Sequence, residues 1–457
     1  MKIIIVGVGK VGYTLASHLC HEDNEVTLVD SHMTALDKAQ ETLDLIGIKG
    51  SGLSIQALVE AGVRETDLVI ATTSSDEVNM LCCLSAKRMG VPHTIARIRN
   101  PEYSREISSL KREIGLDMVI NPEQETAAEI ARILRFPAAI NVDPFAGGRI
   151  ELVAYRIMST DPIKGRPLAE VMTSVKEKVL FCTVLRGDDV IIPDGSFVLQ
   201  EEDIAHIIGR ASQILAFFRR IGKETHSVKN VMVIGGGRIA YYLCDTIARS
   251  NIKVKIIEQD KDRCKELDEL LPNCIIIHGD GTDENLLAQE AIEKCESLVS
   301  ITGNDEENLI TALYASHMGV PKVVTKVTRD NYGRIMQNLK LDCTVSPKNI
   351  TAAQIIRFVR ALKNTIGSNV ETLYKIVGGR AEALQFCANE TTAHLNVPLK
   401  DITFKPNFIV AAIARKGEII IPTGNDFIQK KDTVIIVSSQ ANVVDLNDVF
   451  ADGGKQP

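Results

Sequence analysis

The chain carries the same motif twice, once at the start of each half, and this repeat constrains its fold more than any other feature. A short apolar run leads into a glycine-rich loop in the segments Met1–Gly12 and Lys229–Ala240. In both copies an acidic residue, Asp30 or Glu258, follows 23 positions after the first glycine of the loop. A repeat of half the chain length predicts two structural units of the same kind, joined in tandem.

The repeat extends beyond the two loops. Thr72–Asn79 matches Ile301–Asn308, and residues 50–52 match residues 279–281. At 457 residues the chain is too long for a single core, because cores stop growing near roughly 250–300 residues. We therefore expect four domains, two for each copy, at 1–140, 141–225, 226–365 and 366–457.

The two parts of each copy have different patterns. In the larger part of the first copy, apolar runs alternate with helical patterns, and these runs lie at 2–6, 25–29, 67–71, 94–98 and 117–120. Strands separated by helices predict a parallel sheet that binds ligands at the carboxyl ends of its strands. The predicted fold class is α/β, with tandem Rossmann-like parallel-sheet domains that are each followed by a small α+β domain.

The small domain is predicted from strand-like runs at 150–158, 179–185, 189–192 and 204–208. It buries too little to be a convincing catalytic domain, so we interpret it as a ligand-binding or dimerising module. Amphipathic helices are expected where the two parts join, at 123–134 and 349–360. Their apolar faces contain Ala127, Ile130, Ala131 and Leu134 in the first helix, and Ile350, Ala353, Ile356 and Val359 in the second. Each helix packs either on its own sheet or on a neighbouring copy.

The first glycine loop is a complete G-x-G-x-x-G motif. Gly7 makes the tight turn, Gly9 lets a pyrophosphate approach the backbone, and Gly12 lets the helix pack on the strand. The helix then presents free N–H groups and a partial positive charge to the phosphates. The second copy has Gly235 and Gly237, with Ala240 at the third position.

The acidic residues that follow predict which nucleotide is bound. Asp30 should accept hydrogen bonds from ribose hydroxyls and repel a 2′-phosphate, which favours NAD over NADP. The alternative is that Asp30 only caps a helix or turn. Ser74-x-x-Glu77 reads as a capping box, so Thr73 and Ser74 are better ligand candidates than the acids beside them. Arg97, near the end of the predicted strand at 94–98, meets either a phosphate or an internal carboxylate.

Composition excludes several classes of function. The formal net charge of −7 argues against nucleic acid as a general partner and against direct adsorption to an anionic membrane. No apolar stretch approaches the roughly 20 residues that span a bilayer. The ten cysteines fit no metal or disulfide template. An NAD-dependent oxidoreductase is an alternative, with His206 and Lys164 as its candidate groups, whereas a redox-sensing DNA-binding protein lacks the basic charge.

With these motifs, the chain resembles the TrkA family of Trk-system potassium-uptake regulators. The resemblance rests on Lys2–Gly12, Ser74–Asn79, the Ala96-Arg-Ile-Arg99 segment and Val233–Gly237. It implies nucleotide-binding RCK (KTN) domains, each followed by a small RCK C-terminal domain. It also implies a non-enzymatic cytoplasmic protein, peripheral on the inner face of the membrane, that binds NAD(H) and in some members ATP or ADP. Its implied partner is a membrane potassium-translocating subunit of the TrkH/TrkG kind.

The resemblance also implies particular site residues. The first site would be formed by Gly7, Val8, Gly9, Lys10, Val11, Gly12, Asp30, Thr73, Ser74 and Arg97. The second would be formed by Gly235, Gly236, Gly237, Arg238, Ile239, Glu258 and Lys326. Many single-copy RCK modules have Gly-Asp after the third strand, which Asp280 supplies here in the second copy only, because Ser51 stands in the first. The two sites are therefore expected to differ in ligand.

The resemblance favours a homotetramer, and closed symmetry is common among soluble homo-oligomers. The helices at 123–134 and 349–360 are suited to pairing the two halves through a pseudo-twofold interface. Replacing Ile130 and Leu134 by Glu is accordingly expected to break the assembly.

Overall fold

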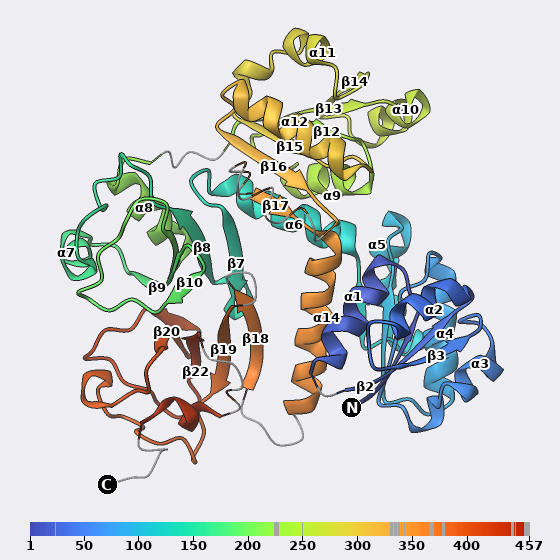
Figure 1. Ribbon diagram of the computed structural model, residues 1–457, viewed down its shortest axis with the longest axis horizontal. Helices are drawn as coiled ribbons and strands as arrows, with labels where there is room; N and C mark the ends of the chain where they lie inside the picture. The colour runs from blue at the N-terminus through green and yellow to red at the C-terminus, as the bar shows by residue number, and fades with distance from the viewer. Residues whose placement is uncertain are drawn as a thin grey trace.

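The computed structural model contains four sheets, two parallel and two antiparallel (Figure 1). It describes residues 1–22, 24–223, 228–248, 250–329, 343–364, 370–376, 380–439 and 445–451, together with residues 332, 336, 339, 341 and 443. The predicted fold class is confirmed, because each half contains a Rossmann-like parallel sheet and a smaller antiparallel sheet. No helix in these ranges combines the length and apolar character needed to cross a membrane.

The first parallel sheet has the strand order β3-β2-β1-β4-β5-β6. Its strands are β1 (Lys2–Val6), β2 (Glu25–Asp30), β3 (Ile46–Lys49), β4 (Leu68–Ala71), β5 (His93–Arg97) and β6 (Met118–Ile120). Its helices are α1 (Lys10–Cys20), α2 (Met33–Gln40), α3 (Ile55–Glu60), α4 (Asp76–Arg88) and α5 (Pro101–Ile114). The central strand β1 is buried on both faces from Ile3 to Val6, which is why it is continuously apolar.

The second parallel sheet repeats this order as β14-β13-β12-β15-β16-β17. Its strands are β12 (Asn230–Ile234), β13 (Lys253–Glu258), β14 (Cys274–His278), β15 (Ser297–Ser300), β16 (Lys322–Lys326) and β17 (Cys343–Val345). Its helices are α9 (Arg238–Ile247), α10 (Lys261–Leu270), α11 (Glu284–Gln289) and α12 (Asp305–His317). In both sheets the glycine loop therefore leaves the central strand at its carboxyl end.

The small sheets also share one topology, β10-β9-β11-β8-β7 and β21-β20-β22-β19-β18. The strands of the first are β7 (Asn141–Phe145), β8 (Ile150–Arg156), β9 (Val179–Arg186), β10 (Asp189–Ile191) and β11 (Ile204–Gly209), with α7 (Leu168–Ser174) and α8 (Ala211–Arg220) beside them. The strands of the second are β18 (Val370–Ile376), β19 (Ala381–Cys387), β20 (Phe408–Arg415), β21 (Glu418–Ile420) and β22 (Thr433–Ser438). The two sheets share one buried cluster, which includes Leu152, Ile208, Ala412 and Val437.

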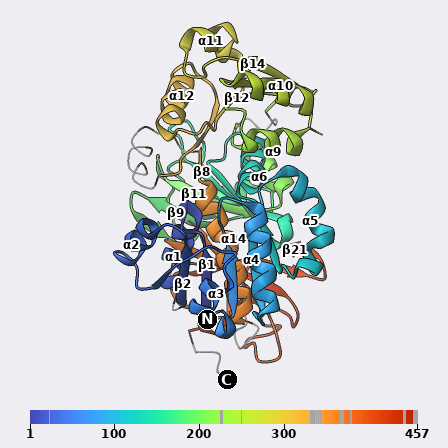
Figure 2. The ribbon, with the colours of Figure 1, turned by 90° about the vertical axis from the view of Figure 1, so that its right-hand side faces the viewer.

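Two long helices join the halves by crossing between them (Figures 1 and 2). Helix α6 (Pro122–Arg135) leaves the first sheet and packs against α9 of the second half, whereas α14 (Pro347–Asn364) leaves the second sheet and packs against α1 of the first half. Ile130 and Leu134 of α6 are fully buried in the core of the second parallel sheet. Ile355 and Val359 of α14 are fully buried in the core of the first. Fully burying one such side chain stabilises the structure by about 1.5–3 kcal/mol.

This crossing decides between the two alternatives for the joint helices. Packing on the helix's own sheet is wrong, and the neighbouring copy is the other half of the same chain. Of the predicted apolar face of α14, Ile356 and Val359 are buried in the first core, Ile350 packs partly buried against the second core, and Ala353 is exposed. Ala352 and Ile355 complete the buried face. Ion pairing fixes α14 further, since Arg360 Nε lies 3.0 Å from Glu22 Oε2.

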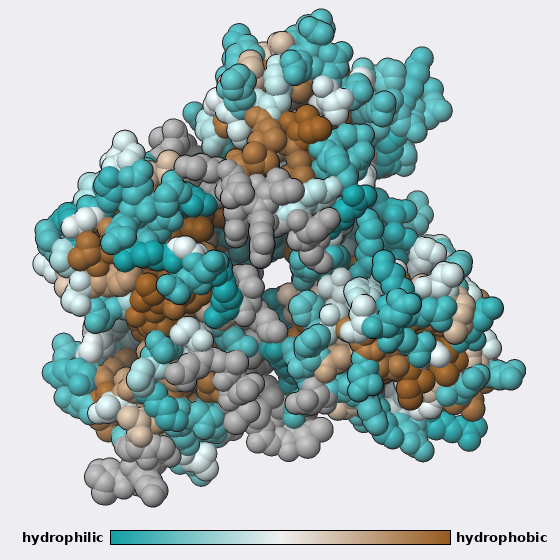
Figure 3. Space-filling view, in the orientation of Figure 1, coloured by the Kyte–Doolittle hydropathy of each residue, from teal (hydrophilic) through white to brown (hydrophobic). Residues whose placement is uncertain are grey.

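The crossing also corrects the expected effect of replacing Ile130 and Leu134. Both side chains lie inside the chain. A charge there acts first on the docking of α6 to the second half and not on contacts between subunits. On the face that the space-filling view shows, hydrophobic residues form separate patches within a mostly hydrophilic surface (Figure 3).

Candidate functional site

The first glycine loop is held tightly between β1 and β4. Gly7 has φ +96°, and an added Cβ there would lie 2.8 Å from the Thr73 amide nitrogen. A Cβ on Gly12 would lie 1.9 Å from the Gly7 carbonyl oxygen, so the fold itself requires glycine at both positions. A Cβ on Gly9 would meet nothing within 4 Å. Gly9 therefore leaves open space at the N-terminus of α1, where the backbone could approach a bound group.

The second glycine loop has the same shape with a looser fit. Gly235 has φ +100°, and Gly237, like Gly9, faces open space at a helix N-terminus. Ala240 takes the third position and is fully buried. Helix α9 therefore accommodates a methyl group at the position where α1 has none.

The predicted acids bind the loops that precede them. Asp30 Oδ2 accepts the Val8 amide N–H at 2.7 Å, and Oδ1 accepts the His32 amide at 2.8 Å. In the second copy, Glu258 Oε2 accepts the Gly236 amide at 2.6 Å and Oε1 accepts the Asp260 amide at 2.8 Å. Asp30 Oδ1 also lies 3.1 Å from His32 Nδ1, whereas Asp30 Oδ2 and the two Glu258 oxygens each accept one of these amides and keep a lone pair to which a ribose hydroxyl could donate.

The charge on Asp30 is favoured in place. Burial acts to raise the pKa of its carboxyl, but the amides of Val8 and His32 donate to the ionised form and hold the pKa below its usual value. Asp30 thus makes the hydrogen bonds of a turn-capping residue, as the alternative to ribose binding predicted. It also remains an ionised acceptor beside the loop.

A buried asparagine organises each site, and the sequence analysis did not single it out. Asn79 Oδ1 accepts the Thr73 amide at 2.8 Å, and its Nδ2 donates to the Arg97 carbonyl at 2.8 Å. Asn308 repeats both contacts with Thr302 and Lys326, at 2.8 and 3.1 Å. Each asparagine thereby ties together the ends of two adjacent strands. Its occurrence at the same place in both copies of the Thr72–Asn79 motif was the available signal.

The segment after β4 corrects one prediction. The residue that caps α4 is Ser75, whose hydroxyl accepts the Val78 amide at 3.2 Å, so the predicted capping box on Ser74 is wrong by one residue. The Thr73 hydroxyl donates within the loop, to Asn79 Oδ1 at 2.8 Å. Asp76 is buried and accepts the amides of Arg99 and Asn100, each at 2.8 Å.

Arg97 and Lys326 are the corresponding cations at the ends of β5 and β16. The Arg97 guanidinium donates to the Thr73 carbonyl. Burial, followed by repulsion from Arg99, lowers the pKa of Arg97 to about 10. Burial also lowers the pKa of Lys326. Both cations are thus held partly desolvated beside a glycine loop, where a bound anion would stabilise their charge.

The two sites lie close enough to act on each other electrostatically. The pKa of Asp305 is lowered mainly by hydrogen bonds from Thr328 and Arg329, and the pKa of Lys326 mainly by burial; the charge of Lys10, in the first loop, adds a smaller lowering to each. Arg238, in the second loop, contributes to the lowered pKa of Arg97 in the first half. The crossed helices thus place the two loops near each other inside one chain.

A direct hydrogen-bond link runs between the halves. The Tyr242 hydroxyl, on α9, donates to the Arg99 carbonyl at 3.0 Å and accepts from Asn121 Nδ2 at 2.9 Å. The guanidinium of Arg99 in turn donates to the Ser74 carbonyl at 2.5 Å. The helix that begins at the second glycine loop is therefore bonded to the rim of the first site.

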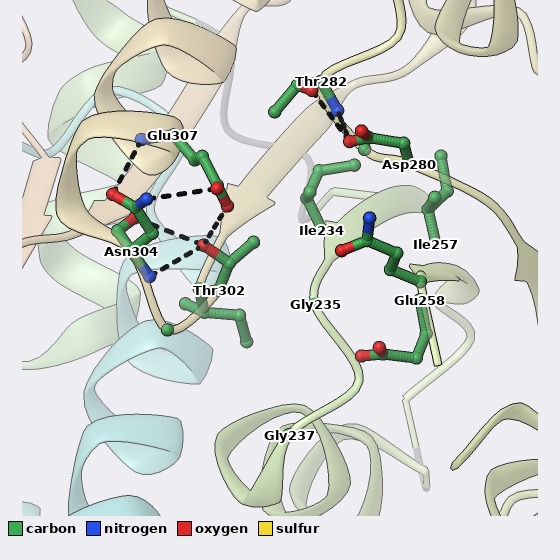
Figure 4. Close-up of a pocket in the computed structure, with 14 residues that line it drawn as sticks. Ile234, Gly235, Gly237, Ile257, Glu258, Asp280, Thr282, Thr302, Asn304 and Glu307 are labelled. Atoms are coloured by element: carbon green, nitrogen blue, oxygen red, sulfur yellow. Dashed lines mark hydrogen bonds between the residues drawn. The ribbon is translucent and has the colours of Figure 1, made fainter. Parts of the chain in front are cut away.

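A pocket of about 340 Å³ opens beside the second glycine loop (Figure 4). Gly235 and Gly237 form its base, and Glu258, Asp280 and Glu307 lie around it. Thr302, which corresponds to Thr73, also lines it. The structure thus brings the second loop, its acid and the segment after β15 to one cavity.

The groups of the oxidoreductase alternative are not brought together as a catalytic pair. His206 is buried in β11, and burial lowers its pKa to about 4, which keeps the ring neutral. Lys164 Nζ instead lies 3.3 Å from Glu201 Oε2, at the surface. Neither residue lines the pocket beside the second glycine loop.

Parallel strands, a glycine loop at a helix N-terminus and an acid at the end of the next strand define a Rossmann-type nucleotide-binding protein. The match to known families is more specific. The model of the TrkA-N domain matches residues 3–122 and 231–347, and the model of the TrkA-C domain matches residues 152–222 and 389–451. The chain belongs to the TrkA family, which confirms the resemblance seen in the sequence.

Full-length relatives and solved structures agree with this assignment. The Trk system potassium uptake protein TrkA of Haemophilus influenzae is 33% identical over 98% of both chains. A Methanosarcina mazei protein named Trk system potassium uptake protein TrkA homolog 2 is 31% identical over 98% of this chain and all of its own. The GsuK RCK domain shares the fold, with a TM-score of 0.64 at 18% identity, covering 96% of this chain and 92% of that chain.

Proposed function

We propose that this protein is a nucleotide-sensing regulatory subunit of a Trk-type potassium uptake system. The observation that carries the proposal is the placement of two glycine-loop sites near each other across the crossed helices. A ligand at either loop would change the electrostatic environment of the other loop. It would also alter the packing of α6 and α14 against the two halves. Nucleotide binding would then shift the geometry of the two halves, provided that the ligand binds two conformations with different affinity.

The ligand is NAD(H), with ATP or ADP as competitors at the first site. The predicted residues of both loops, with Asp30, Thr73, Ser74 and Arg97 in the first site and Glu258 and Lys326 in the second, form the binding surfaces. A channel of this fold, the GsuK channel, has been solved bound to NAD, with a TM-score of 0.63 at 17% identity. The same proposal divides the chain into nucleotide-binding domains at 1–140 and 226–365 and small domains at 141–225 and 366–457.

The partner is a membrane potassium-translocating subunit, contacted as a homo-oligomer at the inner face of the membrane. The names of the full-length relatives support this partner, since they are potassium uptake proteins. The protein itself acts without catalysis, by gating the flux through that subunit.

The decisive experiment measures potassium flux through the reconstituted membrane subunit, with and without this protein and with NADH or ATP. We expect flux to depend on both the protein and the nucleotide. Flux that is indifferent to both would refute the proposed function.

Binding is tested at each loop separately. Gly9→Val should weaken NADH binding at the first site by more than about 100-fold without unfolding the domain, because the new side chain enters only the open space at the helix N-terminus. Gly237→Val is the matched variant for the second site. Asp30→Ala should weaken NADH and relax the discrimination against NADPH. Calorimetry that finds unchanged NADH affinity in Gly9→Val and Asp30→Ala would remove the first-site assignment.

A further inference from the structure

The pocket beside the second glycine loop is acidic. Three of its lining side chains are carboxylates, namely Glu258, Asp280 and Glu307. None of the described residues that line it is a lysine or an arginine. A pocket for a polyphosphate would be expected to show the opposite balance.

The three carboxylates lie at different places along the pocket. Glu258 is bonded to the Gly236 amide, beside the loop, and Asp280 follows β14. Glu307 lies across the pocket from Glu258, in the first turn of α12 (Figure 4). Its Oε1 accepts from Asn304 Nδ2 at 3.1 Å, and its Oε2 accepts a long contact from the Thr302 hydroxyl at 3.4 Å. Glu307 is exposed, so its oxygens can accept further hydrogen bonds.

A nucleotide bound at the loop runs between these groups. Its phosphates would lie at the N-terminus of α9, and its first ribose at Glu258. The part of the ligand beyond the phosphates then extends toward Thr302 and Glu307. In ATP this distal part is more phosphate, whereas in a dinucleotide it is a second ribose and its base.

The first copy lacks two of the three carboxylates. Ser51 takes the place of Asp280, and Val78 takes the place of Glu307. Val78 is half-buried, and its Cγ1 would lie 3.5 Å from a Cβ on Gly52. The asparagines that hold the two sites, Asn79 and Asn308, make the same contacts, so the difference is confined to the lining.

We propose that Glu307, assisted by Asp280, makes the second site select a dinucleotide over a nucleoside polyphosphate. This inference rests on the proposed nucleotide binding and adds the ligand class of one site. The Glu307 carboxylate repels terminal phosphates and accepts hydrogen bonds from the hydroxyls of a second ribose. With Val78 in its place, the first site accepts both ligands. The two sites of one chain then respond to different nucleotides.

The test is calorimetry of the full chain with NADH and with ATP, in the Gly9→Val background that leaves only the second site. Glu307→Val should raise the ATP affinity by roughly tenfold at low salt and lower the NADH affinity severalfold, with the ATP effect shrinking as salt is added. Glu307→Gln keeps the size of the side chain and removes only its charge, so it should show the ATP gain as well. Asp280→Ser should also raise the ratio of ATP affinity to NADH affinity, but by a smaller factor.

Matched variants sharpen the result. Val78→Glu in the Gly237→Val background should lower ATP affinity at the first site. Glu306→Gln is the control, because Glu306 is paired with Arg329 and does not line the pocket, so the affinity ratio should not change. An unchanged ATP-to-NADH ratio in both Glu307 variants, with binding retained, overturns this inference alone. No binding of either nucleotide to the unmodified chain overturns the proposed function as well.

Discussion

The two nucleotide-binding halves share a framework and differ in what surrounds the ligand space. In both, a buried aspartate accepts two backbone amides from the next strand end, Asp76 in one half and Asp305 in the other. Yet Gly12 leaves no room for a side chain, whereas the second half holds Ala240 at that position. Both halves thus keep the buried side chains that hydrogen-bond the end of one strand to the end of the next. The distance between the first helix and the glycine loop, and the residues that line the pocket, differ between the halves.

The largest expected effect comes from breaking the crossed helices. Ile130→Glu would bury an unpaired charge in the second half and should destabilise that half by more than about 4 kcal/mol. Ile355→Glu should do the same to the first half. Hydrogen exchange should therefore show lost protection in β12 for Ile130→Glu and in β1 for Ile355→Glu.

The control for this pair is Ala353→Glu, on the exposed side of α14, which should leave protection unchanged. If Ile130→Glu instead loosened β1 and spared β12, the docking of α6 on the second half would be contradicted.

The next effect concerns the third position of each glycine loop. Gly12→Ala should cost roughly 1–3 kcal/mol, because the new Cβ meets the Gly7 carbonyl, and it should abolish binding at the first site. Ala240→Gly should cost only about 1 kcal/mol, the helix preference for alanine, and retain binding. Chemical unfolding and calorimetry check both. Equal costs in the two variants would mean that the helices have the same spacing after all.

A smaller effect is expected at the link between the halves. Tyr242→Phe removes the hydroxyl that bonds the Arg99 carbonyl and Asn121, at a cost of about 1–2 kcal/mol. Thr14, at the corresponding place on α1, instead donates to the Lys10 carbonyl of its own helix, at 2.8 Å. We therefore expect Tyr242→Phe to reduce the effect of second-site ligand on first-site affinity, and Thr14→Val to leave it intact. Calorimetry with the other site saturated measures this coupling.

The last effect is a pH dependence of stability where the two helices cross. Burial, and then repulsion from Asp143 on β7, raises the pKa of Glu129 from 4.5 to about 7. Arg132 on α6 and Arg357 on α14 act to lower this pKa, and Glu125 adds a small further rise. Because the folded state favours the protonated Glu129, the free energy of unfolding is highest with respect to this group below pH 4.5. That contribution is lost as the pH rises through about 7 and the carboxyl ionises.

The matched change is Glu129→Gln, which copies Gln354 at the corresponding place in α14. It should flatten the dependence of unfolding free energy on pH between about 4.5 and 7, leaving the smaller slope due to Asp143, whose pKa rises to about 6. An unaltered slope would show that Glu129 does not titrate in this range.

Much of the fold was predictable from local pattern. The apolar runs identified β1, β2, β4, β5 and β6, because strands buried on both faces are continuously apolar. The apolar runs alone missed β3 and β7. Ile46–Lys49 is a short stretch containing a glycine, and only the family resemblance implied a strand before Gly50. β7 contains Pro144, which an edge strand tolerates.

The candidate site was predictable where one residue type serves one geometry, as with Gly7, Gly12 and the acids that follow. The placement of the two sites beside each other was not. An amphipathic helix reveals that it has an apolar face but not which sheet covers that face, so Ile130 gave no sign of its partner. Nor did Tyr242, in an apolar stretch of α9, indicate that its hydroxyl bonds a residue 143 positions earlier.

Because α6 and α14 cross within one chain, the pairing of the two halves does not depend on protein concentration. Two separate chains with these helices would have to meet before each could cover the other's core, and their pairing would weaken at low protein concentration. Covalent linkage replaces that encounter by an effective concentration in the millimolar range, on the order of that set by a short tether. The docking of α6 on α9 and of α14 on α1 therefore persists in a cell that makes very few copies of the chain.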